Sequence, residues 1–248
     1  MEKIFGIEDF IEKSNNTETV DELFSVYKTA MEAIGFDRIV FSLMTDHVFI
    51  KRAAKHGIVS NYPDDWMQFY VEKNYEVIDP VRSTVFSSFG PFTWRNMLET
   101  LPVTEAQKTF MNEGEAAGLY RGIGIPLRGP RGVLSGIGAA SSCNDADLSN
   151  KNILSAANIL SQQFYTVYLE LEMRDRSDEE MPFIKLSDRE REVLKWAAQG
   201  KTKSETAAIL SISQHTVHSH IRSALKKLGA NNITVGVLKA LHLSLIQI

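Results

Sequence analysis

Apolar residues recur every three or four positions along several stretches of the first part of the chain, which is the spacing of an amphipathic helix. The stretches are residues 17–34, 63–73, 104–117 and 150–173. In the second stretch Pro63 suits the first helical position, and Asp64 and Asp65 favour the positive end of a helix. The pattern therefore predicts a helix over each of these stretches.

A different pattern marks three further stretches as strands. They are the apolar run 38–44 and the short Gly-rich segments 122–127 and 133–140. The sequence Arg-Gly-Pro-Arg-Gly between the last two favours a hairpin turn. Grouped strands with helices before and after them are typical of a sheet covered by helices. We therefore expect an α+β fold for this part of the chain.

Residues 174–182, Arg-Asp-Arg-Ser-Asp-Glu-Glu-Met-Pro, interrupt the helical pattern. They are charged, show no periodicity and end on a proline, which is typical of a linker. We place a first domain at residues 1–173, the linker at 174–183 and a second domain at 184–248.

The composition indicates a protein of the cytoplasm. The 248 residues are 44% hydrophobic, which is enough for one large or two ordinary cores. Cys143 is the sole cysteine, so no internal disulfide can form, which suits a reducing compartment. The N-terminus lacks the apolar run of a signal peptide, and no stretch reaches the roughly 18 apolar residues of a membrane helix. We therefore expect no membrane partner.

The net charge of −4 hides an asymmetry between the two parts. From Leu186 onward the chain holds nine Lys or Arg and four Asp or Glu, a balance of +5. The preceding 185 residues consequently carry −9. A basic tail on an acidic body suggests different partners for the two parts, and a polyanion suits the tail. Chance in a short segment is the alternative.

Gly200, Lys201 and Thr202 read like the end of a phosphate-binding loop, which needs a glycine five positions before Gly200 and a strand leading in. Position 195 is a lysine, and the residues before Gly200 follow a helical pattern. The nucleotide-binding interpretation therefore fails on both counts.

Capping chemistry accounts for the same residues. Ser187 and Glu190 form a capping box at the start of one helix, and Gly200 ends that helix in a left-handed conformation. Thr202 starts the next helix, and Ser213 caps a third over residues 214–228. The segment 184–248 is thus predicted to be helical, with a tight turn at residues 211–213.

The two sides of the third helix differ. Its apolar residues fall at one stripe: Val217, Ile221, Ala224 and Leu228. Its other side carries polar and basic residues: His215, His218, Ser219, Arg222, Ser223 and Lys226. Two helices joined by a tight turn, the second one basic on its free side, describe a helix-turn-helix. Lys201, Lys203, Lys226 and Lys227 suit phosphate contacts. A helical bundle with a solvated basic face is the alternative.

This segment resembles the C-terminal domain of LuxR-type regulators through L-S-D-R-E-R-E-V-L-K-W-A-A-Q-G-K-T, E-T-A-A-I-L-S-I-S, T-V-x-x-H and K-K-L-G. Three hallmark positions are filled by Glu190, Leu194 and Gly200. The resemblance implies four helices, the last at 234–245 supporting dimer contact, and base reading by His218 and Arg222. The residues expected at the DNA are Lys201, Thr202, Lys203, His215, Thr216, His218, Ser219, Arg222 and Lys226. Ser223 and Thr206 depart from the family's pattern, which bears on the preferred DNA sequence.

The segment 61–80 of the first domain gathers aromatic residues near one carboxylate. Trp66 and Tyr70 lie four apart on one helix face, Tyr62 precedes the helix, and Asp79 follows at a helix-to-strand transition. An indole N–H donates, a carboxylate accepts and a phenol does both, so together they suit a ligand with an amide and carbonyls. Core aromatics and an Asp-Pro turn are the alternative interpretation.

The same residues resemble the acyl-homoserine-lactone receptors of quorum sensing: Y-P-x-x-W-x-x-x-Y, I-D-P, Trp94 and G-L-Y-R-G-I-G-I-P-L-R-G. The resemblance covers both domains and implies an antiparallel sheet between helix layers, an α/β/α sandwich. It implies that Trp66 donates to the lactone carbonyl, Tyr62 to the amide carbonyl, and that Asp79 accepts from the amide. Tyr70 and Trp94 would line the pocket, and Gly122 would permit close packing. Val81 and Gly138 replace hydroxyl-bearing residues, so we expect fewer hydroxyls and more room.

We therefore expect a ligand-controlled transcription factor that binds an N-acyl-homoserine lactone and, as a homodimer, a two-fold-related site in double-stranded DNA. RNA polymerase is a candidate partner, and no cofactor or metal is expected. A regulator of the same DNA-binding class that responds to a non-lactone molecule or a protein is the alternative. An enzyme built on His47, His56 and nearby aspartates lacks any supporting motif.

Overall fold

The computed structural model describes residues 6–47, 50–129, 132–143, 151–174 and 184–247. They divide into two compact units, the first ending with helix α7 (Lys151–Arg174) and the second beginning before helix α8 (Asp188–Ala198). Of the predicted linker, Arg174 is the last residue of α7, and the remainder lies outside the described residues. Among the helices that the structure describes, none combines the length and hydrophobicity that crossing a membrane requires.

The first unit is built on one antiparallel sheet with the strand order β2-β1-β5-β4-β3. The strands are β1 (Arg38–Leu43), β2 (Lys55–Ser60), β3 (Phe92–Thr93), β4 (Tyr120–Arg128) and β5 (Leu134–Ser141). The predicted strands correspond to β1, β4 and β5, whereas β2 and β3 were not predicted. Strand β2 has no alternation of buried and exposed residues, and Gly57 within it has a φ of +63°. Its sequence therefore lacks the period that identifies a strand.

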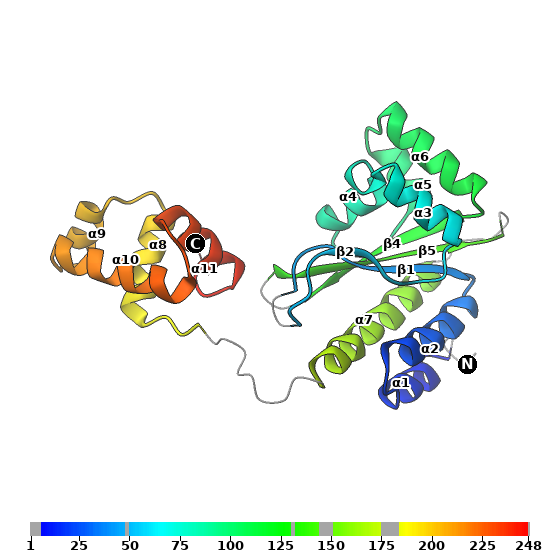
Figure 1. Cartoon of the computed structure of the whole chain (residues 1–248), viewed down its shortest axis with the longest axis horizontal. Coiled ribbons are helices and arrows are strands. Elements are labelled where there is room, and N and C mark those ends of the chain that lie inside the picture. Colours follow the sequence, from blue (N-terminus) through cyan, green and yellow to red (C-terminus); the bar gives the residue numbers. More distant parts are fainter. Residues whose placement is uncertain (1–5, 48–49, 130–131, 144–150, 175–183, 248) are drawn as a thin grey trace. The chain divides into compact units, whose positions relative to one another are not determined.

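Helices cover both faces of this sheet (Figure 1). Helices α1 (Ile7–Asn15), α2 (Val20–Glu32) and α7 lie on one face. The other face carries α3 (Asp64–Glu72), α4 (Pro80–Ser87), α5 (Trp94–Thr100) and α6 (Glu105–Ala116). The expected α/β/α sandwich with an antiparallel sheet is thereby confirmed.

The face under α2 and α7 is filled by a hydrophobic core. Tyr27 stacks on Phe164 with ring centroids 4.6 Å apart, and the edge of Phe41 meets Phe164 at 5.2 Å. The Tyr27 hydroxyl lies 2.6 Å from that of Ser161, so its polar end is satisfied inside the core. Burying each such aromatic side chain stabilises the fold by about 1.5–3 kcal/mol.

Several helix starts differ from the sequence-based boundaries because caps set them. The helix expected from residue 17 begins at Val20, where Thr19 and Glu22 form a capping box. Pro63 occupies the cap position ahead of α3 instead of the first helical position. Helix α1 was not predicted. His47 is buried, and its Nε2 lies 2.9 Å from the Ser135 hydroxyl.

The second unit contains α8, α9 (Lys203–Leu210), α10 (Gln214–Leu228) and α11 (Ile233–His242). The predicted capping box at Ser187 is present, Gly200 has a φ of +79°, and Ser213 caps α10. Thr202 starts α9 as predicted, and the structure adds a capping box there. The last helix starts at Ile233, after the Asn232 cap and one residue before the expected span 234–245, and it ends at His242, three residues before the end of that span. A four-helix domain with a helix-turn-helix, as predicted, is confirmed.

Glu190 ties three segments of the second unit together. Its carboxylate accepts hydrogen bonds from the Ser187 backbone, the Ser223 hydroxyl and the Lys227 ammonium, each at 2.7 Å. Burial alone would raise the pKa of Glu190, but these bonds outweigh it and hold the pKa below its ordinary value. The carboxylate therefore stays ionised, and it fixes α10 against the start of α8.

Candidate functional site

A pocket lies between the sheet and the helices α3–α6 of the first unit. About 650 Å³ of space lies between its lining side chains, a volume that includes open solvent. The candidate ligand residues found here are Tyr62, Trp66, Tyr70, Asp79, Val81, Trp94 and Gly138. The structure thus brings together seven of the eight residues selected from the sequence. Gly122 lies beneath one of them.

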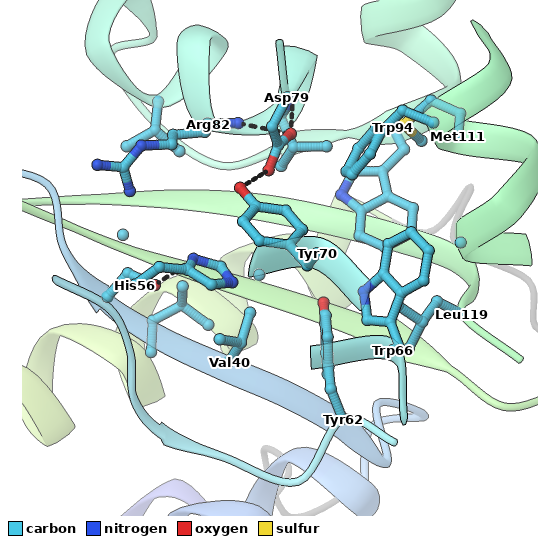
Figure 2. A pocket seen from close by; sticks show the side chains of 18 of the residues that line it. Val40, His56, Tyr62, Trp66, Tyr70, Asp79, Arg82, Trp94, Met111 and Leu119 are labelled. Carbon is cyan, nitrogen blue, oxygen red and sulfur yellow. Dashed lines mark hydrogen bonds between the residues drawn. The ribbon is translucent and has the colours of Figure 1, made fainter. Parts of the chain in front are cut away.

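Asp79 is held by the start of α4 and by a neighbouring tyrosine. One carboxylate oxygen accepts from the backbone N–H of Val81 (2.8 Å) and of Arg82 (3.1 Å), and the other accepts from the Tyr70 hydroxyl (3.0 Å). Burial is the main influence and raises the pKa of this carboxyl, which the three hydrogen bonds oppose. Asp79 therefore caps a helix, a correction to the expected helix-to-strand transition, and it faces the pocket as well (Figure 2).

Helix α3 supplies Trp66 and Tyr70 from one face, as their spacing predicts. Both side chains are buried, and the edge of one ring meets the other at 6.5 Å. Trp66 also packs against Phe110 of α6, which fixes its indole at the pocket wall. Tyr62 precedes the helix and is buried beside them. Burial in this site raises the pKa of Tyr62 above its ordinary range, so its hydroxyl is a proton donor.

Trp94 rests directly on the backbone of Gly122. A Cβ atom at position 122 would lie 2.3–2.4 Å from the indole ring, a distance that atoms do not tolerate. Glycine therefore lets β4 approach the start of α5 and sets the position of the indole. The Trp94 Nε1 group is buried and has no hydrogen-bond partner within the described residues. A buried unpartnered donor costs about 1–3 kcal/mol, so an acceptor from a ligand would relieve it.

That Gly138 gives this pocket more room than the pockets of relatives stays a prediction. A Cβ atom there would lie 3.0 Å from Val40 and 3.1 Å from the Tyr62 hydroxyl, so these side chains already occupy the space. The expectation of fewer hydroxyls than in relatives also stays a prediction, and Ser42 of β1 supplies one hydroxyl to the lining. Val81 is buried at the first turn of α4.

Sequence reasoning missed one polar part of the pocket, formed by Ser42, His56 and Arg82. His56 lies on β2, which has no recognisable strand pattern. Arg82 lies on α4, and here a signal existed. Asp79 followed by Pro80 combines an N-cap with a first-turn proline, a pattern that predicts a helix. A helix starting here places Arg82 in its first turn, next to Asp79.

The second unit presents a basic face on α10. His215, His218, Ser219, Arg222 and Lys226 are exposed and follow one side of the helix, while Val217 and Ile221 are buried on the other. The Lys203 ammonium lies 3.3 Å from His218 Nδ1, which places the start of α9 beside this face. Lys201 is exposed, Thr202 caps α9, and Thr216 lies at the first turn of α10 with its hydroxyl 2.8 Å from Ser213.

Two polar residues of α10 also hold this helix to α8, and a third polar residue is buried in α9. The Ser223 hydroxyl and Lys227 are both bonded to Glu190. Thr206 is buried, and its hydroxyl donates to the Thr202 carbonyl at 2.9 Å, which explains how a polar residue is accommodated there. The three hallmark residues also serve the fold. Glu190 accepts the hydrogen bonds that join α10 to α8, Leu194 lies in the hydrophobic core, and Gly200 ends α8.

Two family models match the chain. The model described as "Autoinducer binding domain" matches residues 19–166, and "Bacterial regulatory proteins, luxR family" matches residues 185–240. The first match includes the whole lining of the pocket, and the second includes the basic face of α10.

Curated relatives are regulators of transcription. The chain is 32% identical to the regulatory protein SdiA of Escherichia coli over 221 residues, which cover 88% of this chain and 87% of that one. It is 30% identical over 207 residues to a putative HTH-type transcriptional regulator of Sinorhizobium fredii, and this match spans 83% of the chain but 62% of that protein. The comparisons thus show a regulator of transcription and not an enzyme.

Solved structures share the fold. Escherichia coli SdiA matches with a TM-score of 0.69 at 24% identity, covering 98% of both chains, and its structure "in complex with octanoyl-rac-glycerol" matches at 0.66, covering 95% and 93%. The "N-Acylhomoserine Lactone Dependent LuxR Family" factor CepR2 from Burkholderia cenocepacia matches at 0.51 and 18% identity, covering 67% of this chain and 93% of that one. Together with both family models, this places the chain in the LuxR family of autoinducer-binding transcriptional regulators.

Proposed function

We propose that the chain is a transcription factor whose DNA binding is controlled by an N-acyl-homoserine lactone in the pocket beside Asp79 and Trp66. The observation that carries this proposal is the placement of buried groups of complementary type around one cavity: the indole of Trp66, the phenol of Tyr62 and the carboxylate of Asp79. A lactone with an amide offers two carbonyl acceptors and one N–H donor, which match two donors and one acceptor.

The carboxylate of Asp79 has room for one more donor. An ionised carboxylate offers about four acceptor positions, and three are used, by Val81, Arg82 and Tyr70. Because burial raises the pKa of Asp79, a further hydrogen bond to the ionised form would stabilise the site. The amide N–H of an acyl-homoserine lactone supplies that bond.

The names of the relatives support a small acylated signal. CepR2 is described as dependent on an N-acylhomoserine lactone, and SdiA has been solved with octanoyl-rac-glycerol, which is not a lactone. The SdiA complex is a specific reason to keep a non-lactone acyl ligand as the alternative for this chain. Both ligands place a polar head on an acyl chain, so the same polar residues would hold them.

We further propose that the chain acts in the cytoplasm as a homodimer on a two-fold-related DNA site. A helix-turn-helix dimer reads two half-sites about one helical turn apart, so operator symmetry follows protein symmetry. Helix α11, which the family resemblance assigns to dimer contact, leaves Leu238 61% exposed, as a partner surface requires. An activator bound in this way would also contact RNA polymerase.

The pocket assignment is tested by unfolding the chain with and without a panel of N-acyl-homoserine lactones. A ligand that binds the folded form alone raises the free energy of unfolding by about 2.7 kcal/mol at a hundredfold excess over Kd. We expect this gain for the wild type and a much smaller one for Trp66→Phe, which keeps the ring but loses the indole donor.

Trp196→Phe is the matched control, because Trp196 lies on α8 of the other unit. This variant should keep the full gain. Mass spectrometry of the molecule that copurifies with the chain separates the alternatives: an acyl-homoserine lactone supports the proposal, and a non-lactone ligand favours the second candidate. An equal response of both tryptophan variants would place the lactone elsewhere.

A further inference from the structure

The pocket has a second polar end that the proposed lactone contacts do not use. Figure 2 shows Trp66 and Trp94 on one side of Tyr70, and His56 and Arg82 on the other. Tyr70 separates the two ends, since its ring stacks on His56 at 4.3 Å and meets Trp66 edge-on at 6.5 Å. A ligand whose head is held by Trp66 and Asp79 therefore extends its tail along Tyr70 toward His56 and Arg82.

His56 presents a proton donor to this end. The Gly57 backbone N–H donates to the Ser42 hydroxyl oxygen at 3.1 Å, and that hydroxyl lies 3.0 Å from His56 Nδ1. We assign the tautomer in which the Ser42 hydroxyl donates its own hydrogen to Nδ1. Burial, assisted by the charge of Arg82, lowers the pKa of His56 to about 4, so the ring is neutral, and in this tautomer its proton lies on Nε2. Within the described residues Nε2 has no hydrogen-bond partner.

Arg82 brings further donors to the same place. Its side chain is 12% exposed, with one nitrogen 2.5 Å from Glu76 and another 3.3 Å from the Met44 sulfur. A guanidinium has five N–H donors, and a thioether is a weak acceptor, so most of these donors lack a strong partner among the described residues. N–H donors at a pocket wall that lack a strong acceptor favour the binding of a ligand whose oxygen accepts from them.

The local charge decides what kind of oxygen fits. Glu76 already balances the guanidinium of Arg82, and the carboxylate of Asp79 lies on the same helix end. A second anion would be repelled by Asp79 and would compete with Glu76, whereas an uncharged oxygen meets neither cost. The neutral His56 ring and the stacked Tyr70 also give this end flat aromatic walls.

We propose that the signal carries an uncharged oxygen, a hydroxyl, phenol or keto group, at the distal end of its acyl or aryl chain, held by His56 Nε2 and Arg82. This inference rests on the proposed function, because it assumes that the head of the signal lies at Trp66 and Asp79. It assigns His56 and Arg82 as specificity-determining residues and Ser42 as the residue that fixes the tautomer of His56.

The experiment compares two synthetic probes that differ by one hydroxyl group: a homoserine lactone with a para-hydroxyphenylpropanoyl chain and its phenylpropanoyl analogue. The Kd of each for the full-length wild-type chain is measured by calorimetry. A site built to hydrogen-bond a hydroxyl discriminates strongly against the analogue without it, so we expect at least about a tenfold preference for the hydroxylated probe. His56→Phe, which keeps the stacking on Tyr70, and Arg82→Met should both abolish this preference while retaining the phenylpropanoyl probe.

Arg95→Met is the matched control. Arg95 is paired with Glu99 of its own helix much as Arg82 is paired with Glu76, but its side chain is 78% exposed and outside the pocket lining. This variant should keep the full preference. Equal affinity of the wild type for both probes overturns the inference and leaves the proposed function intact. Binding of neither probe overturns the inference as stated for an aryl chain, and the lactone panel described above then decides the proposed function separately. The comparison of the two probes on the wild type tests the inference even where a variant fails to fold. Arg82→Lys, which keeps the charge with fewer donors, should retain only part of the preference.

Discussion

At Asp79 a single side chain serves both the fold and the pocket. Its carboxylate caps α4 through two backbone N–H groups, and the same carboxylate accepts from Tyr70 inside the pocket. The residue type could be predicted as a ligand contact from the sequence, because an interior carboxylate needs donors. Its role as a helix cap was missed, and with it the orientation of Arg82. Site residues are thus found from the sequence where their chemistry is distinctive, and they are missed where a backbone turn determines them.

His56 gives the pocket a pH dependence with a definite sign. Its pKa is about 4 in the folded chain and about 6.5 when unfolded, so between these values the unfolded state binds a proton that the folded state does not. The contribution of His56 to the free energy of unfolding is therefore largest above pH 6.5. It falls as the pH drops toward 4, by on the order of 3 kcal/mol at most. We expect His56→Phe to flatten the pH dependence of denaturant unfolding over this range.

The exposed His215 provides the matched control for that titration. His215→Phe should leave the difference between pH 7 and pH 4.5 unchanged. A wild-type profile that coincides with that of His56→Phe would mean that the ring of His56 is free to take up a proton in the folded chain.

The variant Gly122→Ala tests whether the backbone of β4 sets the position of the Trp94 indole. Gly122→Ala would introduce a Cβ atom 2.3 Å from Trp94, so we expect a loss of about 1–3 kcal/mol in stability and weaker binding of the signal. Gly90→Ala is the control, because a Cβ atom there meets nothing within 4 Å. Denaturant unfolding and ligand titration measure both effects. Unchanged behaviour of Gly122→Ala would show that Trp94 moves aside at no cost.

At the scale of elements, the predicted basic helix of the second unit has the bounds that the structure shows. Helix α10 runs over the predicted 214–228 because Ser213 caps its start and Gly229, in the left-handed region, follows its end. Strands β2 and β3 were missed because their pattern depends on the pocket and on neighbouring strands. β2 borders the pocket through His56, and β3 consists of two residues paired with β4. Local signals therefore sufficed for the DNA-binding unit and only in part for the sensor unit.

Substitutions on the exposed face of α10 should weaken DNA binding in two ways, either at the specific site or on all sequences alike. Arg222 is exposed, with no ion pair among the described residues, and it is placed to touch a base edge. Arg222→Ala should cost about 1–3 kcal/mol on the specific site and little on unrelated DNA. Lys226→Ala should weaken binding to all sequences alike and reduce the salt slope by about 1.

Arg189→Ala serves as the control, since Arg189 lies on α8 and is paired with Glu192. Fluorescence anisotropy at several salt concentrations measures all three variants. An equal loss on every sequence for Arg222→Ala would make that residue a phosphate contact.

For the whole molecule, the division of charge follows the division into two units. The basic second unit suits a polyanion, and the acidic first unit holds the pocket. The domain boundaries stay a prediction, since residues 175–183 lie outside the described part of the chain. If the signal favours the dimer that binds DNA, the coupling is reciprocal: DNA must raise the affinity for the signal by the same factor.

The most direct test of this account is the affinity of the full chain for a two-fold-related DNA site, selected from a random pool in the presence of signal. It is measured with and without an N-acyl-homoserine lactone. The account predicts that the lactone tightens DNA binding about 5–150-fold in the wild type and not in Trp66→Phe. An equal DNA affinity in the presence and absence of a lactone that demonstrably binds the pocket would contradict it.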